Sequence, residues 1–485
     1  MIVTNGEISV ELEDVEGSTL LDAIRKAGLP FAAPCAGKGT CGKCNVTVQD
    51  KSGVFTVRAC ATPAEGVLHV KISGAASLTS LDLFREAVTG NEHGVAIDLG
   101  SSTLDVVLVD LTTGTTIAEA GRMNPQIIYG SDVISRIEAA EAGHLGDLQQ
   151  LILDALHDMI LQLCSLVTLS PRSLSSITLA GNTIMLHLAC SLSPAGIGIY
   201  PYQPLSFFGE HMELWTDLPP VWLAPCISGY VGGDVVAGML AEQQQPSLLI
   251  DLGTNGEIAL QTGKGSIAAA TAAGPVFEGM NILYGMAALP GAIKSASYDE
   301  VTDQFSVEVI GGGEAKGICG SGLIDIIAFM LLHGLIDESG RLLSVNQKDR
   351  FFVLSNSEVV ITQKDIRNLQ LAKAAIAAGI EVVLDAAGLT PDDLASVAIA
   401  GGFGLHINKE HAAALGLIPH SLLSKTTSIG NSSLAGARAA LLNAEARDLV
   451  VKLARETEYI ELSTDTRFTE PFINNMSFEH TCSKL

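Results

Sequence analysis

Alternating apolar and polar residues mark two similar segments of this chain. Residues 95–110, VAIDLGSSTLDVVLVD, contain an apolar run to Asp98, a polar turn over residues 99–103 and a second apolar run. Residues 248–259, LLIDLGTNGEIA, repeat this pattern, with Asp251 in the place of Asp98. Apolar runs that flank a Gly- and Ser-containing turn are typical of paired β-strands. The sequence therefore predicts the same strand–turn–strand unit twice.

The residues that follow each hairpin also correspond. In the first half the predicted elements are a strand over 115–120, a helix over about 147–167, a strand over 176–180 and a helix over 184–189. In the second half a strand over 396–400 ends in Ala-Gly-Gly-Phe-Gly. Each half is a three-strand meander followed by alternating strands and helices, which predicts a mixed sheet covered by helices. An insertion over roughly 285–370 contains Gly320-Ser321-Gly322, which leads into an apolar core helix over 323–335. These three residues are expected to form the helix N-terminus, either near a ligand or as a plain cap.

The N-terminal part follows a different pattern, of short strands around one helix. Asn5-Gly6 separates two apolar runs, and this dipeptide favours the tight turn of a β-hairpin. The helical spacing of Leu20, Ile24 and Ala27 predicts a helix over 19–27. Short strands are predicted over 45–49, 55–58 and 67–72. This order of strands and one helix is that of a β-grasp domain.

Four cysteines gather in this part of the chain: Cys35, Cys41, Cys44 and Cys60. Glycines 37, 39 and 42 let backbone N–H groups turn inward, where they can hydrogen-bond thiolates and sulfides. The spacing resembles that of the 2Fe–2S ferredoxins of the plant and adrenal type, with a longer first gap and a shorter last gap. That resemblance implies that the four cysteines hold a 2Fe–2S cluster. A zinc site is the alternative, but such sites usually pair two C-x2-C units, and only Cys41 and Cys44 form one.

Composition narrows the class of protein. The net charge is -25 and no cluster of Lys and Arg is visible, which argues against a nucleic-acid partner. No apolar run reaches the roughly 18 residues of a membrane span, and the N-terminus lacks the pattern of a signal peptide. These features predict a cytoplasmic protein with no membrane partner. In a reducing compartment the scattered cysteines are expected to be small core residues: Cys164, Cys190, Cys226, Cys319 and Cys482.

The two polar turns have the chemistry of phosphate binding. Their N–H groups and hydroxyls suit phosphate oxygens, and the aspartate before each turn can hold a bridging cation. The residues are Asp98, Gly100, Ser101, Ser102 and Thr103 in the first turn, and Asp251, Gly253, Thr254, Asn255 and Gly256 in the second. Taken alone, either aspartate is about as consistent with stabilising the turn as with binding a cation. The doubled order favours a clamp, because two facing copies can enclose one chain of phosphates.

This doubled arrangement resembles the superfamily of acetate and sugar kinases, heat-shock chaperones and actin (ASKHA, RNase H-like), over about residues 94–445. The resemblance implies that Asp98 and Asp251 position Mg²⁺ and the water that attacks the γ-phosphate of ATP. It also implies an adenosine-binding turn made of Gly401, Gly402, Phe403 and Gly404. Without the other motifs, this turn would be interpreted as a closely packed turn that leads into a helix. The sequence leaves open whether Glu257 faces the site or solvent.

The order of the two parts is itself informative. A 2Fe–2S domain followed by an actin-like ATPase with DLGSST, LAGNTIM, DLGTNGE, AGPVFEG, ICGSGLID and AGGFG resembles the reductive activators of corrinoid proteins. The resemblance implies ATP-dependent, one-electron reduction of Co(II) to Co(I) in a partner corrinoid protein, supplied by a low-potential electron donor. The oligomeric state stays open, with a homodimer among the options.

Two other functions remain compatible with these motifs. One is an acetate- or sugar-kinase-like phosphotransferase whose iron–sulfur domain senses redox state. The other is a nucleotide-gated binding protein in which the cluster is structural. A phosphorylated product would indicate the first, and ATP-dependent partner affinity without redox turnover would indicate the second.

The predicted fold class is a multi-domain α/β protein, in which a β-grasp ferredoxin domain precedes a duplicated actin-like ATPase. The predicted domains are a 2Fe–2S domain over 1–74, a short linker over 75–93 with a helix over 78–88, a first ATPase subdomain over 94–245, a second over 246–445, and a C-terminal tail over 446–485 with a helix over 446–456.

Overall fold

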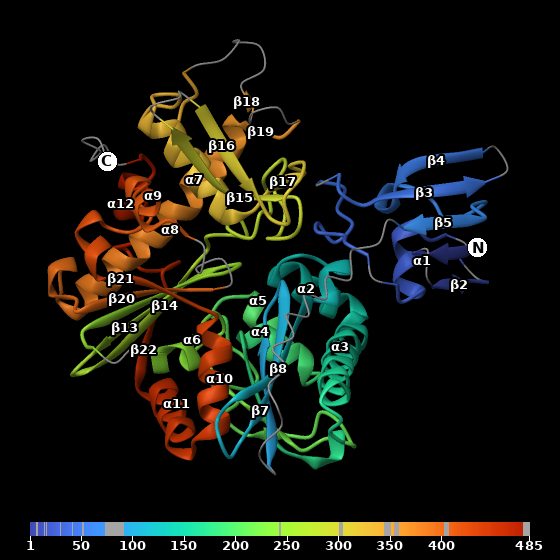
Figure 1. Cartoon of the computed structure of the whole chain (residues 1–485), viewed down its shortest axis with the longest axis horizontal. Helices are drawn as coiled ribbons and strands as arrows, with labels where there is room; N and C mark the ends of the chain where they lie inside the picture. Colours follow the sequence, from blue (N-terminus) through green and yellow to red (C-terminus); the bar gives the residue numbers. More distant parts are fainter. Residues whose placement is uncertain are drawn as a thin grey trace. The chain divides into compact units, whose positions relative to one another are not determined.

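The structure is a computed structural model (Figure 1), and the described part of the chain consists of residues 1–478 apart from a few segments. Those segments are 6–7, 14, 16, 30, 41, 51–52, 73–91, 242–243, 300–303, 344–350, 354–357 and 402–406. The predicted linker helix over 78–88 and Cys482 lie outside the described residues. The chain forms two compact units, Met1–Asp234 with Ala437–Asp448, and Val235–Gly436 with Leu449–Leu485. Both contain helices and mixed sheets, which confirms the predicted α/β class.

The N-terminal residues form the predicted β-grasp sheet with one helix. Its elements are β1 (Ile2–Thr4), β2 (Ser9–Glu11), α1 (Leu20–Lys26), β3 (Asn45–Asp50), β4 (Gly53–Arg58) and β5 (His69–Ile72). The strand order is β2-β1-β5-β3-β4, and β1 and β5 run parallel. Thr19 and Asp22 form a capping box at the start of α1, which fixes where the helix begins. Leu20 and Ile24 of this helix are fully buried and supply part of the core.

The first unit contains the first predicted hairpin at the centre of its larger sheet. The strands are β6 (His93–Leu99), β7 (Thr103–Asp110), β8 (Thr116–Met123), β9 (Leu174–Gly181), β10 (His211–Met212) and β11 (Val221–Leu223), in the order β10-β11-β9-β6-β7-β8. The helices are α2 (Val133–Ala139), α3 (Leu145–Leu166), α4 (Thr183–Ala189) and α5 (Ala195–Gly198). Helix α3 packs on β7 and α4 (Figure 1), and its buried face includes Leu148, Ile152 and Leu163. This is the apolar stripe expected of a helix that covers a sheet.

The second unit repeats that arrangement. Its sheet has the order β21-β20-β12-β13-β14-β22 and consists of β12 (Ser247–Leu252), β13 (Gly256–Thr262), β14 (Gly265–Thr271), β20 (Ser396–Ala400), β21 (Thr426–Gly430) and β22 (Thr457–Ile460). The antiparallel hairpin β12–β13 and the parallel neighbour β20 match β6–β7 and β9 of the first unit. The duplication predicted from the sequence therefore extends to strand order and direction.

The remaining elements include helices at the points where the chain passes between the units and the segments of the insertion. The former are α6 (Gly233–Gly238), α10 (Ser432–Leu442) and α11 (Ala444–Glu456). The segments of the insertion are β15 (Ala292–Asp299), β16 (Gln304–Val309), β17 (Gly317–Ile318), α7 (Gly320–Leu332), β18 (Phe351–Val353) and β19 (Val360–Thr362). They are followed by α8 (Gln363–Ala387), which begins near the end of the insertion, and later by α9 (Lys409–Ala414) and α12 (Thr469–Asn474). The C-terminal residues are integrated in the second unit, because β22 pairs in parallel with β14.

The core helix of the insertion begins earlier than the sequence indicated. Gly320, Ser321 and Gly322, expected to lead into the helix, form the first turn of α7 and are buried. A Cβ on Gly322 would lie 2.2 Å from the carbonyl oxygen of Ile293, so glycine lets α7 lie directly against β15. The hydroxyl of Ser321 donates to the carbonyl of Lys294 at 2.7 Å. The Gly-Ser-Gly sequence thus serves close packing of a helix on a strand.

Among the described residues, no helix is long and apolar enough to cross a membrane.

Candidate functional site

The first predicted phosphate loop lies where β6 ends and the chain turns into β7. In the sheet register Asp98 faces Asp105 of β7 and Ala180 of β9. A Cβ on Gly100 would lie 2.7 Å from the carbonyl oxygen of Thr103, so the turn closes tightly only with glycine at this position. Asp98 is therefore held at the end of a central strand, immediately before a turn whose backbone is compact.

Three side chains to which the sequence analysis assigned no role hold this loop; one of them, Asn182, belongs to the LAGNTIM motif. Asn124 donates to the carbonyl of Gly100 at 2.9 Å, and Asn182, at the N-terminus of α4, donates to the Ser101 hydroxyl at 2.9 Å. The guanidinium of Arg136 donates to the carbonyl of Ser101 at 2.5 Å. Asn124 and Arg136 are fully buried. The loop is thus preorganised by hydrogen bonds from segments that are distant in sequence.

The second predicted phosphate loop connects β12 to β13 in the second unit. Asp251 faces Glu257 of β13 and Ala400 of β20 in the register. The hydroxyl of Thr254 donates to the carboxylate of Glu278 at 3.1 Å, and this glutamate belongs to the AGPVFEG sequence. Glu257 is 8% exposed, so its carboxylate does not face solvent, which answers the question that the sequence left open.

The predicted adenosine turn is described only at its first glycine. Gly401 has φ +101°, and a Cβ there would lie 2.6 Å from the carbonyl oxygen of Leu252 and 3.1 Å from Oδ1 of Asp251. Glycine is therefore required where β20 passes the end of β12. This brings the start of the turn next to Asp251. Gly402, Phe403 and Gly404 lie outside the described residues.

The cysteine loop of the N-terminal domain brings two of its predicted ligands together. The Sγ atoms of Cys44 and Cys60 are 3.3 Å apart. Between Cys35 and Cys44 the backbone repeatedly takes positive φ angles, at Ala36, Gly37, Gly39 and Gly42. Cys41 lies outside the described residues, and within the part that is described no site gathers three or more ligand-type side chains.

This donor set fits an iron–sulfur cluster. Two thiols at this separation can ligate one iron, and Cys35 is half-buried in the same loop. A loop with positive φ angles turns its N–H groups toward its concave side, which is the hydrogen bonding that cluster sulfurs need. With a cluster bound, the domain would supply one-electron transfer.

Comparison with known proteins follows the same division of the chain. The model for the C-terminal ASKHA domain of RACo matches residues 245–485, that for the RACo middle region matches 93–246, and that for a 2Fe-2S iron-sulfur cluster binding domain matches 3–65. The chain is 32% identical over 450 residues to the corrinoid activation enzyme RamQ of Eubacterium limosum, covering 85% of this chain and 74% of that protein. The chain belongs to the family of corrinoid activation enzymes.

Further members support the assignment to this family of activators. The chain is 28% identical over 430 residues to the [Co(II) methylated amine-specific corrinoid protein] reductase of Methanosarcina barkeri, covering 80% of this chain and 77% of that protein. A solved structure of a reductive activator for corrinoid, iron-sulfur protein is 29% identical, with a TM-score of 0.72 and 99% of each chain covered. The family resemblance predicted from the sequence is therefore confirmed.

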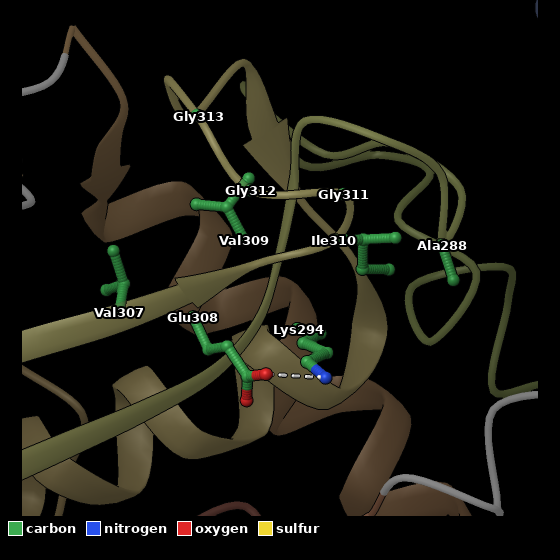
Figure 2. Close-up of a pocket in the computed structure, with 9 residues that line it drawn as sticks. All are labelled: Ala288, Lys294, Val307, Glu308, Val309, Ile310, Gly311, Gly312 and Gly313. Carbon is green, nitrogen blue, oxygen red and sulfur yellow. Dashed lines mark ion pairs between the residues drawn. The ribbon is translucent and has the colours of Figure 1, made fainter.

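A cavity of about 740 Å³ lies in the insertion of this family member (Figure 2). Its lining includes Gly311, Gly312 and Gly313, which follow β16. Lys294 and Glu308, which also line it, form an ion pair with a distance of 2.7 Å between nitrogen and oxygen. The lysine charge is thus neutralised within the protein, and we assign no ligand to this cavity.

Three of the scattered cysteines are expected to resist alkylation in the native activator. Burial raises the pKa of the thiols of Cys190 and Cys226 to about 12 and that of Cys164 to about 11. At pH 8 a thiol with a pKa near 12 is thiolate in roughly one molecule in ten thousand, whereas about a quarter of exposed thiols are thiolate. Mass spectrometry after iodoacetamide treatment at pH 8 should find these three unmodified unless the protein is first unfolded. Modification at the rate of a small thiol would contradict the shielding of these thiols from solvent in the structure.

Proposed function

We propose that this protein reduces the cobalt of a partner corrinoid protein from Co(II) to Co(I), in a reaction driven by ATP. The observation that carries the proposal is that one chain joins a ferredoxin-type cysteine loop to a duplicated ATPase with a phosphate loop in each half. Corrinoid activation enzymes similar over most of this chain support the same function. One electron leaves the reduced cluster, cobalt accepts it, and an external low-potential donor restores the cluster.

The four cysteines of the N-terminal loop would hold the 2Fe–2S cluster: Cys35, Cys41, Cys44 and Cys60. A plant-type cluster has a potential of about -400 mV. We infer that reduction of the cobalt of a resting corrinoid protein needs a stronger driving force than such a cluster supplies, which gives a physical reason for coupling the transfer to ATP. The protein is proposed to act in the cytoplasm, where thiols stay reduced.

Asp98 and Asp251 would act on the ATP. Each aspartate is the penultimate residue of a central strand that leads into a turn, a position from which its carboxylate can orient Mg²⁺ and the attacking water. The N–H groups and hydroxyls of residues 100–103 and 253–256 would bind the phosphates, and residues 401–404 the adenosine. ATP hydrolysis in folds of this kind is coupled to domain movement, which here would make electron transfer to cobalt favourable.

The test is an anaerobic mixture of the reduced protein with a Co(II) corrinoid protein from the same organism. We expect the Co(I) absorption band to rise with Mg·ATP and to stay at background with ADP or without nucleotide. Omitting the corrinoid protein controls for absorption changes of the cluster itself. Hydrolysis of ATP with an intact cluster but no Co(I) with any corrinoid protein of the organism would contradict the proposal. A phosphorylated small molecule would then indicate a phosphotransferase.

A further inference from the structure

One segment of the first unit contacts both the phosphate loop and the cysteine loop. This segment, residues 124–131 (NPQIIYGS), follows β8 and is called the bridge segment here. At its start, Asn124 donates its backbone N–H to the carbonyl of Ser102 at 2.8 Å and its side-chain amide to the carbonyl of Gly100 at 2.9 Å. The bridge segment is therefore bonded directly to the turn predicted to bind phosphate.

The other end of the bridge segment is bonded to the cysteine loop. The N–H and the hydroxyl of Ser131 both donate to the carbonyl of Pro34, at 3.1 and 3.0 Å. The N–H of Ala33 donates to the carbonyl of Ile127 at 3.3 Å. Pro34 immediately precedes Cys35, so these bonds fix the backbone next to a predicted cluster ligand.

Two arginines strengthen these contacts, one at each end. Arg25 of α1 donates to the carbonyl of Ile128 at 3.0 Å and to that of Ala36 at 3.2 Å, and so joins the bridge segment to the residue after Cys35. Arg136 of α2 donates to the carbonyl of Gly130 at 3.3 Å and to that of Ser101 at 2.5 Å. Hydrogen bonds from a guanidinium are stronger than those between neutral groups, and its planar shape fixes their directions.

Between its ends the bridge segment is anchored to α3. The amide of Gln126 donates to the carbonyl of Leu148 at 2.8 Å, and the hydroxyl of Tyr129 donates to Asp147 at 3.0 Å. Gln126 is fully buried and Tyr129 is 5% exposed. A buried segment with fixed hydrogen bonds has few alternative positions, so displacement of one end is transferred to the other.

Phosphate binding acts on the same peptide groups that the bridge network holds. The carbonyls of Gly100, Ser101 and Ser102 accept from Asn124 and Arg136. Because a peptide unit is planar, each of these carbonyls rotates together with the N–H of the next residue. Those N–H groups belong to residues 101–103, which are proposed to bind phosphate. When they reorient toward a phosphate, the hydrogen bonds to the bridge network must adjust.

We propose that the bridge segment couples nucleotide binding at residues 100–103 to the surroundings of the cluster loop, with Arg25 and Arg136 as positioning residues. The inference rests on the proposed function and deepens it, because it names the route by which the bound nucleotide affects the electron carrier. Coupling is reciprocal: if nucleotide shifts the reduction potential of the cluster, reduction of the cluster changes nucleotide affinity by the same factor.

The first test measures this reciprocity in the full-length protein with its cluster. The Kd for a non-hydrolysable Mg·ATP analogue is determined with the cluster oxidised and reduced, and the midpoint potential is determined with and without analogue. We expect the two Kd values to differ by about fivefold or more. A tenfold difference must appear as a shift of about 59 mV for a one-electron couple. Equal Kd values and an unshifted potential would overturn the inference, although ATP-dependent cobalt reduction could still be observed.

The second test locates the coupling in the bridge network. Arg25→Met removes the donors to Ile128 and Ala36, and we expect the ratio of the Kd values to fall below about twofold. Arg25→Lys keeps a cationic donor and should restore part of the ratio. Lys26→Met is the matched control, because it removes the neighbouring, exposed cation of the same helix and should leave the ratio unchanged.

Two further variants keep the test decisive if Arg25→Met does not retain its cluster. Ser131→Ala removes only the hydroxyl bond to Pro34, and Arg136→Met removes the bond to Ser101 at the opposite end. Both should reduce the ratio while the visible spectrum of the cluster is preserved. An unchanged ratio in variants that carry a full cluster would overturn the inference. Failure of the proposed function is distinguished by the absence of Co(I) in the wild-type protein.

Discussion

Replacement of Asp251 with alanine is expected to abolish ATP hydrolysis and ATP-dependent cobalt reduction while the cluster is retained. Asp251 is the penultimate residue of β12, and its Oδ1 would lie 3.1 Å from a Cβ on Gly401, so the carboxylate is directed to the start of the proposed adenosine turn. Loss of one group that stabilises a phosphoryl-transfer transition state costs on the order of a hundredfold in rate or more. The phosphate-release rate and the Co(I) absorption band measure the two effects.

The interpretation of this variant requires that the rest of the protein is intact. Asp251 belongs to the second unit and the cluster cysteines belong to the first, so iron content and the visible spectrum should match those of the wild type. Asp251→Asn keeps the shape of the side chain and should be similarly inactive. Asp392→Asn, at an exposed aspartate of the same unit, should hydrolyse ATP normally. Full ATP-dependent activity of the Asp251 variants would show that this carboxylate has no role in the reaction.

Elements with strong local signals were predictable from the sequence. Asn5-Gly6 favours a hairpin, and the structure pairs β1 with β2 around it. The helix predicted over about 147–167 is α3, Leu145–Leu166, because its apolar positions recur with helical spacing and face the sheet. The strand predicted over 396–400 is β20. In each case the residues that determine the element lie within it or next to it.

The contacts that organise the site were not predictable in this way. Arg25 and Ile128 are 103 positions apart, and Ser131 and Pro34 are 97 apart, and no periodicity in one sequence connects such residues. Arg136 gave no signal either, because an arginine in a short helix is normally exposed, whereas here it is fully buried. The predicted start of α7 was wrong for a related reason. Glycine is required at position 322 because the backbone there lies against Ile293, which belongs to another element.

The same contrast explains why the cluster ligands and phosphate loops could be recognised in the sequence, whereas the residues that position them could not. A cluster ligand or a phosphate loop has a composition imposed by its chemistry, so the type and spacing of its residues are visible in one sequence. A positioning residue has only to donate a hydrogen bond in the right place, and many side chains on many elements can do so. Asn124 and Arg136 were therefore found only when the structure placed them beside Gly100 and Ser101.

Replacement of Cys35 with alanine is expected to abolish electron transfer to cobalt while nucleotide binding is retained. The variant lacks one of four thiolates proposed to hold the cluster, and Cys35 lies between Pro34 and Ala36, whose carbonyls are fixed by Ser131 and Arg25. The backbone should therefore keep its path when the thiol is removed. Iron and sulfide analysis should show loss of the cluster, and no Co(I) band should form with ATP.

A second cysteine variant distinguishes the loss of a cluster ligand from the loss of a cysteine that is not a ligand. Cys190→Ala removes a half-buried cysteine at the end of α4, outside the ferredoxin domain, and should keep both the cluster and cobalt reduction. Both variants should bind a non-hydrolysable Mg·ATP analogue, because neither change touches the phosphate loops. The redox dependence of that binding should persist in Cys190→Ala and disappear in Cys35→Ala, where no cluster is left to change its redox state. A Cys35→Ala protein with full iron content and normal Co(I) formation would instead assign the fourth ligand to another residue.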